Sequence, residues 1–239
     1  MAASAGGSTL LIGTRKGAFV LSSDNQRKTW TLSDPIFLGH IIYHFVSNAN
    51  TCLMAAKTGH LGPTVFRSSD RGVTWVESSS PPAFPSVEAG EKGRAVNLVF
   101  WLTPGHKSES GVWYAGTAPA GLFRSDDDGV TWKSVSGFNE HESYKEWTAG
   151  GETPGGQLLH SIIVDPTDKN KMILAISPGG VFESNDQSAT WSPLNKGCAA
   201  DFMPDQAAEY GHDPHCVVMS ASRPQRLYQQ NHCGIYRLD

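Results

Sequence analysis

Lys and Arg never cluster in this sequence, and the charge balance is slightly acidic. The 239 residues include 19 basic and 23 acidic side chains, which gives a net charge of −4. Proteins that hold nucleic acid by neutralising its phosphates need a concentrated positive surface. We therefore expect no nucleic-acid partner.

Extended apolar segments are missing as well. No stretch approaches the roughly 20 apolar residues that a membrane-spanning helix needs. Residues 1–9 lack the basic start and the apolar run of a secretory signal. The four cysteines form no CxxC pair and are too few for a disulfide framework. These features predict a cytoplasmic protein with no membrane partner; the cysteines are Cys52, Cys198, Cys216 and Cys233.

A short motif, Ser-x-Asp-x-Gly-x-Thr-Trp, recurs along the chain. It is complete at 68–75 and at 125–132, and it has Ser188 in place of glycine at 184–191. A degenerate copy with one extra residue lies at 22–30. The spacing of the copies is close to one four-stranded blade plus variable loops, which indicates a repeat architecture.

Each part of the motif has a structural role. Glycine permits a positive φ in the turn, and the Asp and Ser oxygens accept hydrogen bonds from backbone N–H groups. The tryptophan is a large apolar plate suited to burial between neighbouring sheets. Around each copy, short apolar runs, Gly- or Pro-containing turns and alternating strands follow one another. This pattern is typical of β-hairpins and predicts an all-β fold.

The sequence resembles the BNR/Asp-box repeat proteins, a β-propeller family that includes sialidases, sortilin-type domains and photosystem-assembly propellers. Segments 13–17, 59–64, 159–162 and 229–234 are similar to a bacterial group described as sialidase-like or as BNR-repeat glycosyl hydrolases. The resemblance covers nearly the whole chain. The motif is specific for the fold and carries little information about function.

In this family the motif lies between the third and fourth strands of a blade, counted from the inside. The resemblance therefore implies one propeller domain over residues 1–239, with about five four-stranded blades. The first blade lacks its innermost strand and the last lacks its outermost strand. The blades are expected at 10–34, 41–78, 94–137, 158–195 and 215–239.

Members of the bacterial group are longer, so the chain resembles a truncated propeller. Two outcomes are open. The sheets close into a compact ring through an irregular seam, or they form an open arc. The exposed edges of an open arc would pair with another chain, which predicts a homo-oligomer.

The propeller resemblance places ligands on the face opposite the Asp-box turns. There, one aligned position at the start of the expected innermost strands holds His44, Asn97, His160 and His215. His60 and His232, in loops after second strands, and Arg15 in the first blade extend this channel mouth.

Imidazoles suit zinc-like divalent metals, so His44, His160 and His215 are candidate metal ligands, with nearby acids completing the site. In the alternative interpretation, the same side chains form hydrogen bonds between neighbouring blades around a water-filled channel. A polar small-molecule or carbohydrate ligand in this mouth is a further expectation, with His44 and Asn97 among its contacts.

Two long loops, 138–157 and 197–214, are expected on the same face. Long loops without regular structure are often functional. Their acids include Glu146, Glu209 and Asp213, which are the candidate catalytic carboxylates, because glycoside hydrolysis needs such a pair. Trp147 and Tyr210 are candidate stacking plates for a sugar. The alternative is that these loops are acidic, solvent-exposed segments that cover the channel mouth without taking part in catalysis.

Sialidases resemble one another in three arginines that clamp the substrate carboxylate, because a guanidinium binds a carboxylate through two hydrogen bonds. In this chain only Arg15 and Arg94 are expected on the ligand face, and the Arg-Ile-Pro signature is absent. Sialic-acid cleavage is therefore not expected.

The first functional hypothesis is a sialidase-like propeller that binds a small ligand, a sugar or a partner through a His-rich channel mouth. The alternative is a hydrolase that acts on glycosidic bonds through loop carboxylates, or with a metal held by the His ring. The sequence has no P-loop, dinucleotide fingerprint or GxSxG elbow that would favour another chemistry.

Overall fold

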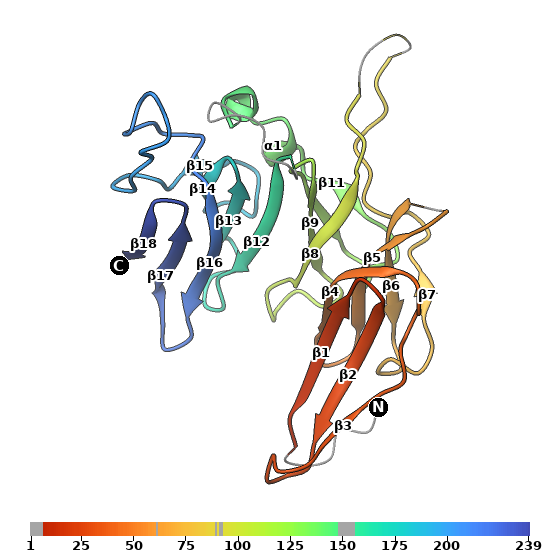
Figure 1. The fold of residues 1–239 in the computed structure, drawn as a ribbon. Coiled ribbons are helices and arrows are strands. Elements are labelled where there is room, and N and C mark those ends of the chain that lie inside the picture. The colour runs from red at the N-terminus through yellow and green to blue at the C-terminus, as the bar shows by residue number, and fades with distance from the viewer. Residues whose placement is uncertain (1–6, 61, 89, 91–92, 148–155) are drawn as a thin grey trace.

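The computed structural model describes residues 7–60, 62–88, 90, 93–147 and 156–239. The described chain forms five antiparallel sheets with three, four, four, four and three strands in chain order (Figure 1). This result confirms the all-β prediction and the expected short sheets at both ends.

The strands follow one another as antiparallel neighbours within each sheet. The first sheet contains β1 (Thr9–Thr14), β2 (Gly17–Ser23) and β3 (Trp30–Leu32). The second contains β4 (Ile41–Ser47), β5 (Cys52–Thr58), β6 (Gly62–Ser68) and β7 (Val76–Glu77). The third contains β8 (Leu98–Pro104), β9 (Trp113–Ala118), β10 (Leu122–Ser125) and β11 (Lys133–Ser134). The fourth contains β12 (Leu158–Val164), β13 (Met172–Ser177), β14 (Gly180–Ser184) and β15 (Ser192–Pro193). The fifth contains β16 (Pro214–Ser220), β17 (Arg223–Asn231) and β18 (Gly234–Leu238).

Neighbouring sheets pack through their first strands. β8 packs on β4 and β5, β12 packs on β8 and β9, and β16 packs on β12 and β13. In the same way β4 packs on β1 and β2, so β1 occupies the place of a second strand. Within residues 7–60 the first sheet therefore has no innermost strand, as the sequence predicted.

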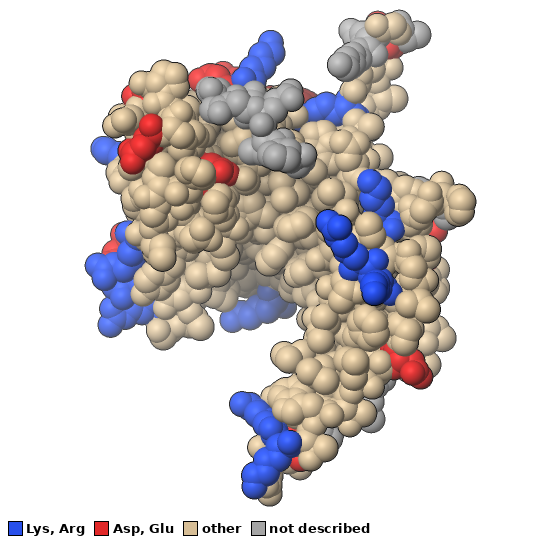
Figure 2. Space-filling model, in the orientation of Figure 1, with Lys and Arg blue, Asp and Glu red and all other residues tan. Residues whose placement is uncertain are grey.

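The five sheets form an open arc. In the part of the chain that the structure describes, no strand of the first sheet packs in this way on a strand of the fifth. Figure 1 places β1–β3 and β16–β18 at opposite ends, and Figure 2 shows a wide recess between them. On the face shown in Figure 2, Lys and Arg lie in separate small groups.

The repeated motif closes a tight turn after the third strand of each middle sheet. In the second sheet, the Ser68 hydroxyl receives a hydrogen bond from Gly72 N (2.7 Å) and donates one to Asp70 (2.7 Å). Asp70 also accepts from the backbone N of Thr74 at 2.9 Å. These bonds, led by that of the Thr74 hydroxyl, hold the pKa of Asp70 below its usual value. The motif is a structural turn.

The copy at 184–191, which has Ser188 in place of glycine, shows why glycine is usual in this turn. Gly72 and Gly129 have φ values of 85° and 81°, and Ser188 takes φ 68° in the same place. Ser188 N still donates to the hydroxyl of Ser184 at 2.9 Å. The turn therefore forms even where a side chain must adopt the left-handed conformation.

The motif tryptophans pack against the preceding sheet. Trp132 and Trp191 are buried in cores shared with the second and third sheets, respectively. Trp30 belongs to the first sheet, and 40% of its surface is exposed. Its exposure follows from its position at the end of the arc.

Two short helices interrupt the loop that follows the third sheet. They are α1 (Ser136–Asn139) and the 3₁₀ helix η1 (Glu142–Glu146). The prediction of a loop without regular structure over 138–157 is therefore wrong at its start, and residues 148–155 lie outside the described part. No helix in the described residues is long and apolar enough to cross a membrane.

Candidate functional site: an acid-pair cavity and a histidine cluster

The first strands of the later sheets share a β-bulge that determines which side chains are equivalent. The register shifts around Tyr43 in β4, Phe100 in β8, His160 in β12 and His215 in β16. A bulge adds one residue to one strand and redirects the local side chains. The predicted alignment of His44 and Asn97 with His160 and His215 is therefore wrong, by one residue in β4 and by three in β8.

His44 forms a contact between neighbouring sheets. Its Nδ1 accepts a hydrogen bond from Leu102 N at 3.0 Å, and its ring stacks on Trp101 with a centroid distance of 4.3 Å. Burial lowers the pKa of His44 to about 4, which keeps the imidazole neutral and able to accept this bond. Ser161 occupies the equivalent place in β12, where its hydroxyl accepts from Val217 N at 3.4 Å. These contacts match the interpretation of inter-blade hydrogen bonding.

His160 is also held by its surroundings. It is buried, its Nε2 lies 2.7 Å from the carbonyl oxygen of Pro214, and its Nδ1 lies 2.9 Å from the hydroxyl of Ser161. Burial lowers the pKa of this imidazole as well. His160 thus ties the fourth sheet to the start of the fifth.

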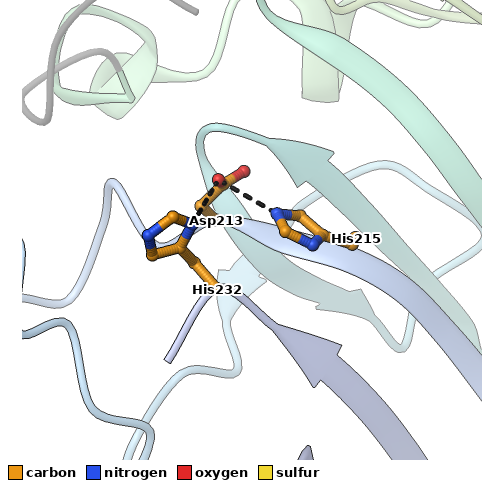
Figure 3. A group of neighbouring side chains, drawn as sticks. All are labelled: Asp213, His215 and His232. Atoms are coloured by element: carbon orange, nitrogen blue, oxygen red, sulfur yellow. Dashed lines mark hydrogen bonds and ion pairs between the residues drawn. The ribbon is translucent and has the colours of Figure 1, made fainter. Parts of the chain in front are cut away.

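The structure does not bring His44, His160 and His215 together as one ligand set. Within the described residues, the one group of three His, Cys, Asp or Glu side chains whose ligand atoms lie within 4.8 Å of one another is Asp213, His215 and His232 (Figure 3). The pairing of β16 with β17 explains this change of partners, because it sets Pro214 opposite Asn231 and lets His232 N donate to the carbonyl oxygen of Asp213. Asp213, expected as a catalytic carboxylate, belongs to this histidine cluster.

A groove beside the histidine cluster is lined by aromatic and imidazole rings. Phe100 and Trp101 of the third sheet face His160, Ser177 and His215 across a cavity of about 420 Å³. Sequence reasoning did not name the two aromatic residues, although the Phe-Trp pair occupies the bulge of β8. An alignment of β8 with β12 and β16 at their bulges would have placed Phe100 and Trp101 at the channel mouth, beside His160 and His215.

Two of the predicted catalytic acids line one cavity. Glu146 lies at the end of η1, and Glu209 lies in the loop before β16; both are exposed. Asp213 is not among the residues that line this acid-pair cavity, whose volume is about 420 Å³. The lining consists of Lys145, Glu146, Met203, Asp205, Ala208, Glu209 and Tyr210.

Tyr210 forms part of the cavity wall. Its ring stacks on Phe182 with centroids 6.0 Å apart. Burial, together with the nearby charges of Glu209 and Glu146, raises the pKa of Tyr210. The phenol therefore stays protonated, and its hydroxyl forms a hydrogen bond with the buried Ser143 side chain.

Two hydrogen bonds to backbone carbonyl oxygens position the loop that carries Glu209 and Tyr210. The Asn195 side chain donates to the carbonyl oxygen of Glu209 at 2.9 Å, and Gly211 N donates to the carbonyl oxygen of Gly179 at 3.0 Å. These bonds tie the loop to the fourth sheet on both sides of Tyr210.

The prediction that Trp147 is a stacking plate is wrong. Trp147 is 0% exposed, and its Nε1 donates to the hydroxyl of Ser143 at 2.9 Å. Its ring packs on Phe138 with centroids 5.2 Å apart. The turns of α1 and η1 direct this indole into the core.

The remaining candidates lie apart from the acid-pair cavity. The Arg94 guanidinium lies over the rings of Phe84 (4.2 Å) and Tyr144 (4.5 Å) and donates to the carbonyl oxygen of Asn139. Arg94 therefore holds loops together. Arg15 and His60 are exposed in strand-connecting turns, and Asn97 is exposed just before β8.

No protein-family model matches the chain. Similar curated sequences include an oligoxyloglucan-reducing end-specific xyloglucanase of Emericella nidulans, 28% identical over 171 residues, which are 71% of this chain and 18% of that protein. A xyloglucanase of a Paenibacillus species is 31% identical over 97 residues, which are 38% of this chain and 8% of that protein.

Solved structures with similar folds include glycoside hydrolases of family GH74. The Niastella koreensis GH74 enzyme has a TM-score of 0.61 at 19% identity, with 95% of this chain and 33% of that chain covered. The GH74 xyloglucanase from Xanthomonas campestris has a TM-score of 0.56 at 18% identity, with 96% and 42% covered. These similarities support a propeller-type fold. The chain spans less than half of the length of each of these four proteins.

Proposed function

We propose that this chain acts on a carbohydrate of the β-glucan class, with Glu146 and Glu209 as the carboxylate pair that hydrolyses a glycosidic bond. The observation that carries the proposal is that these two acids, which come from separate loops, line one open cavity with Tyr210. The names of the similar proteins, which are xyloglucanases, support the substrate class.

The cavity offers the groups that this reaction needs. One carboxyl group protonates the leaving oxygen while the other, ionised, activates water or attacks the sugar carbon directly. The Tyr210 ring, which lines the cavity, offers an apolar surface for a sugar ring. Lys145 adds a cation at the rim of the cavity.

The experiment measures hydrolysis and binding separately. Xyloglucan oligosaccharides are incubated with the full chain and with Glu146→Gln and Glu209→Gln, and new reducing ends are counted. Loss of a general acid or base costs on the order of 10²–10⁴ in rate. We expect losses in this range for both variants, with binding by calorimetry changed only a few-fold. Glu77→Gln, on β7 of the second sheet, is the matched control and should keep full activity.

A binding module without hydrolysis is the second candidate. The groove lined by Phe100 and Trp101 favours it, because aromatic faces suit apolar sugar surfaces. In the same calorimetry, oligosaccharide binding that Trp101→Ala abolishes, together with no new reducing ends from the unmodified chain, would select this function. Absence of both binding and hydrolysis would refute a carbohydrate role.

A further inference from the structure

We infer that Asp213, His215 and His232 form a binding site for one divalent transition-metal ion, represented by Zn²⁺. Figure 3 shows the Asp213 carboxylate between the two imidazoles. One Asp213 carboxylate oxygen, Oδ2, lies 3.2 Å from His215 Nε2 and 3.7 Å from His232 Nδ1. Two imidazoles and one carboxylate are a donor set suited to zinc and related ions. This inference is independent of the acid pair.

The distances fit the space that a metal ion needs. Ligand atoms bound at about 2.1 Å with tetrahedral angles lie roughly 3.4 Å apart. The separations of Asp213 Oδ2 from His215 Nε2 and from His232 Nδ1, 3.2 and 3.7 Å, lie on either side of that value. All three ligand atoms lie within 4.8 Å of one another, so small side-chain rotations would bring them to one ion.

Ordered backbone carries the three ligands. The carbonyl oxygen of Asp213 accepts a hydrogen bond from His232 N at 2.9 Å, which ties the entry to β16 to the turn after β17. The β-bulge between Pro214 and Cys216 directs His215 toward the same point. The cluster therefore comes from one sheet rim rather than from mobile ends.

Neighbouring polar groups orient the ligands. Ser177 donates its hydroxyl hydrogen to Asp213 Oδ1, which leaves Oδ2 toward the imidazoles. The Gln230 side-chain amide lies 3.0 Å from His215 Nδ1. When Nε2 binds a metal, Nδ1 carries the proton, and after an amide flip the amide oxygen of Gln230 can accept a hydrogen bond from this Nδ1–H. Such outer partners fix the tautomer and orientation of ligating histidines.

The site is open enough to hold a further ligand. The side chains of Asp213, His215 and His232 are 16%, 41% and 59% exposed. Three protein ligands leave a fourth position of a zinc ion for water or for a ligand oxygen. His215 and Ser177 also line the groove of Phe100 and Trp101, so an oxygen of a molecule in that groove could reach the ion.

The test uses the full chain without an affinity tag, stripped with a chelator and titrated with Zn²⁺ against a chromophoric competitor. We expect one equivalent of Zn²⁺ per chain, and a loss of affinity of more than about tenfold in both His215→Ala and His232→Ala. Ser177→Ala should weaken binding by about 10- to 100-fold, the range for outer-shell partners. Co²⁺ should give visible absorption bands with the unmodified chain and lose them in His232→Ala.

Two controls separate this site from other zinc ligands. His60→Ala removes an exposed imidazole in the β5–β6 turn, and Cys216→Ser removes the exposed thiol next to His215; both should bind Zn²⁺ as the unmodified chain does. Thermal melting verifies that each variant is folded, and the 59% exposed His232 side chain is a safe position to change. Absence of stoichiometric Zn²⁺ binding would overturn the inference. So would binding that survives both histidine substitutions, or binding that depends equally on Cys216.

Discussion

The contact between His44 and the third sheet makes stability depend on pH in a defined range. The unfolded imidazole has its ordinary pKa near 6.5, whereas burial lowers the pKa of folded His44 to about 4. Between these values the unfolded chain takes up a proton that the folded chain does not. The free energy of unfolding therefore falls as the pH decreases from about 7 to about 4.

The expected size follows from the two pKa values. One pKa unit corresponds to about 1.4 kcal/mol, so His44 should remove about 2 kcal/mol of stability between pH 7 and pH 5. Most carboxylates titrate below this range, so their contribution there is small. Protonation also displaces Leu102 N, which donates to Nδ1 at 3.0 Å.

The assay is urea unfolding of the unmodified chain and of His44→Gln at pH 7, 6 and 5. Glutamine offers an acceptor to Leu102 N and does not titrate. The loss of stability between pH 7 and pH 5 should be smaller by about 2 kcal/mol in the variant. His60→Gln, which changes an exposed imidazole, should lose as much stability as the unmodified chain. Equal losses in His44→Gln and the unmodified chain would refute the reasoning.

Two further substitutions test the packing that positions the sites. In Gly116→Ala, the new Cβ would lie 2.5 Å from the carbonyl oxygen of Leu159, where the third and fourth sheets meet. Urea unfolding should show that Gly116→Ala lowers the free energy of unfolding by about 1–3 kcal/mol. Gly59→Ala, whose new Cβ would have no atom within 4 Å, should lower it much less. Equal losses in the two variants would contradict the close approach of the two sheets. Trp147→Ala should lower the free energy of unfolding, measured by calorimetry, by about 3–5 kcal/mol because this indole is fully buried. A change below about 1 kcal/mol would indicate that the indole is exposed instead.

The sheets could be predicted from the sequence because their signals are local. An Asp and a closing tryptophan recur at each turn, and two of the four copies have glycine at a positive φ. Arg27 and Ser188, which take positive φ values in the other two copies, show that the signal tolerates the loss of glycine. The short sheets at both ends follow from counting strands on either side of these turns, and the structure has the same strand numbers.

The candidate site was harder to predict because it depends on register. The bulge lies at Tyr43 in β4 and at His160 in β12, so His44 is one residue out of line with His160, and no local feature of the sequence marks the bulge. The sequence also does not show which side chains of a loop are buried. The loop that contains η1 buries Trp147 but places Glu146 in the wall of the cavity that Glu209 and Tyr210 line. The cluster of Asp213, His215 and His232 needs the fold, because His232 joins it through the pairing of β16 and β17.

The predictions about association and location remain untested. The apolar side chains of Trp30, at one end of the arc, and Ile235, at the other, are 40% and 80% exposed. These exposed ends keep homo-oligomer formation as a prediction, which sedimentation equilibrium would test. A monomer at all concentrations would contradict it. The cytoplasmic location rests on the sequence alone.

The most direct test of the central proposal is a crystal structure of Glu146→Gln/Glu209→Gln with a bound xyloglucan oligosaccharide. The proposal predicts a sugar ring against Tyr210, with a glycosidic oxygen between the two substituted side chains. The distance between the side chains at positions 146 and 209 would also indicate the stereochemistry of hydrolysis. Carboxyl groups about 5–5.5 Å apart are typical of retaining enzymes, and those about 6.5–9.5 Å apart are typical of inverting enzymes. An oligosaccharide bound only in the groove of Trp101, with the acid-pair cavity empty, would contradict it.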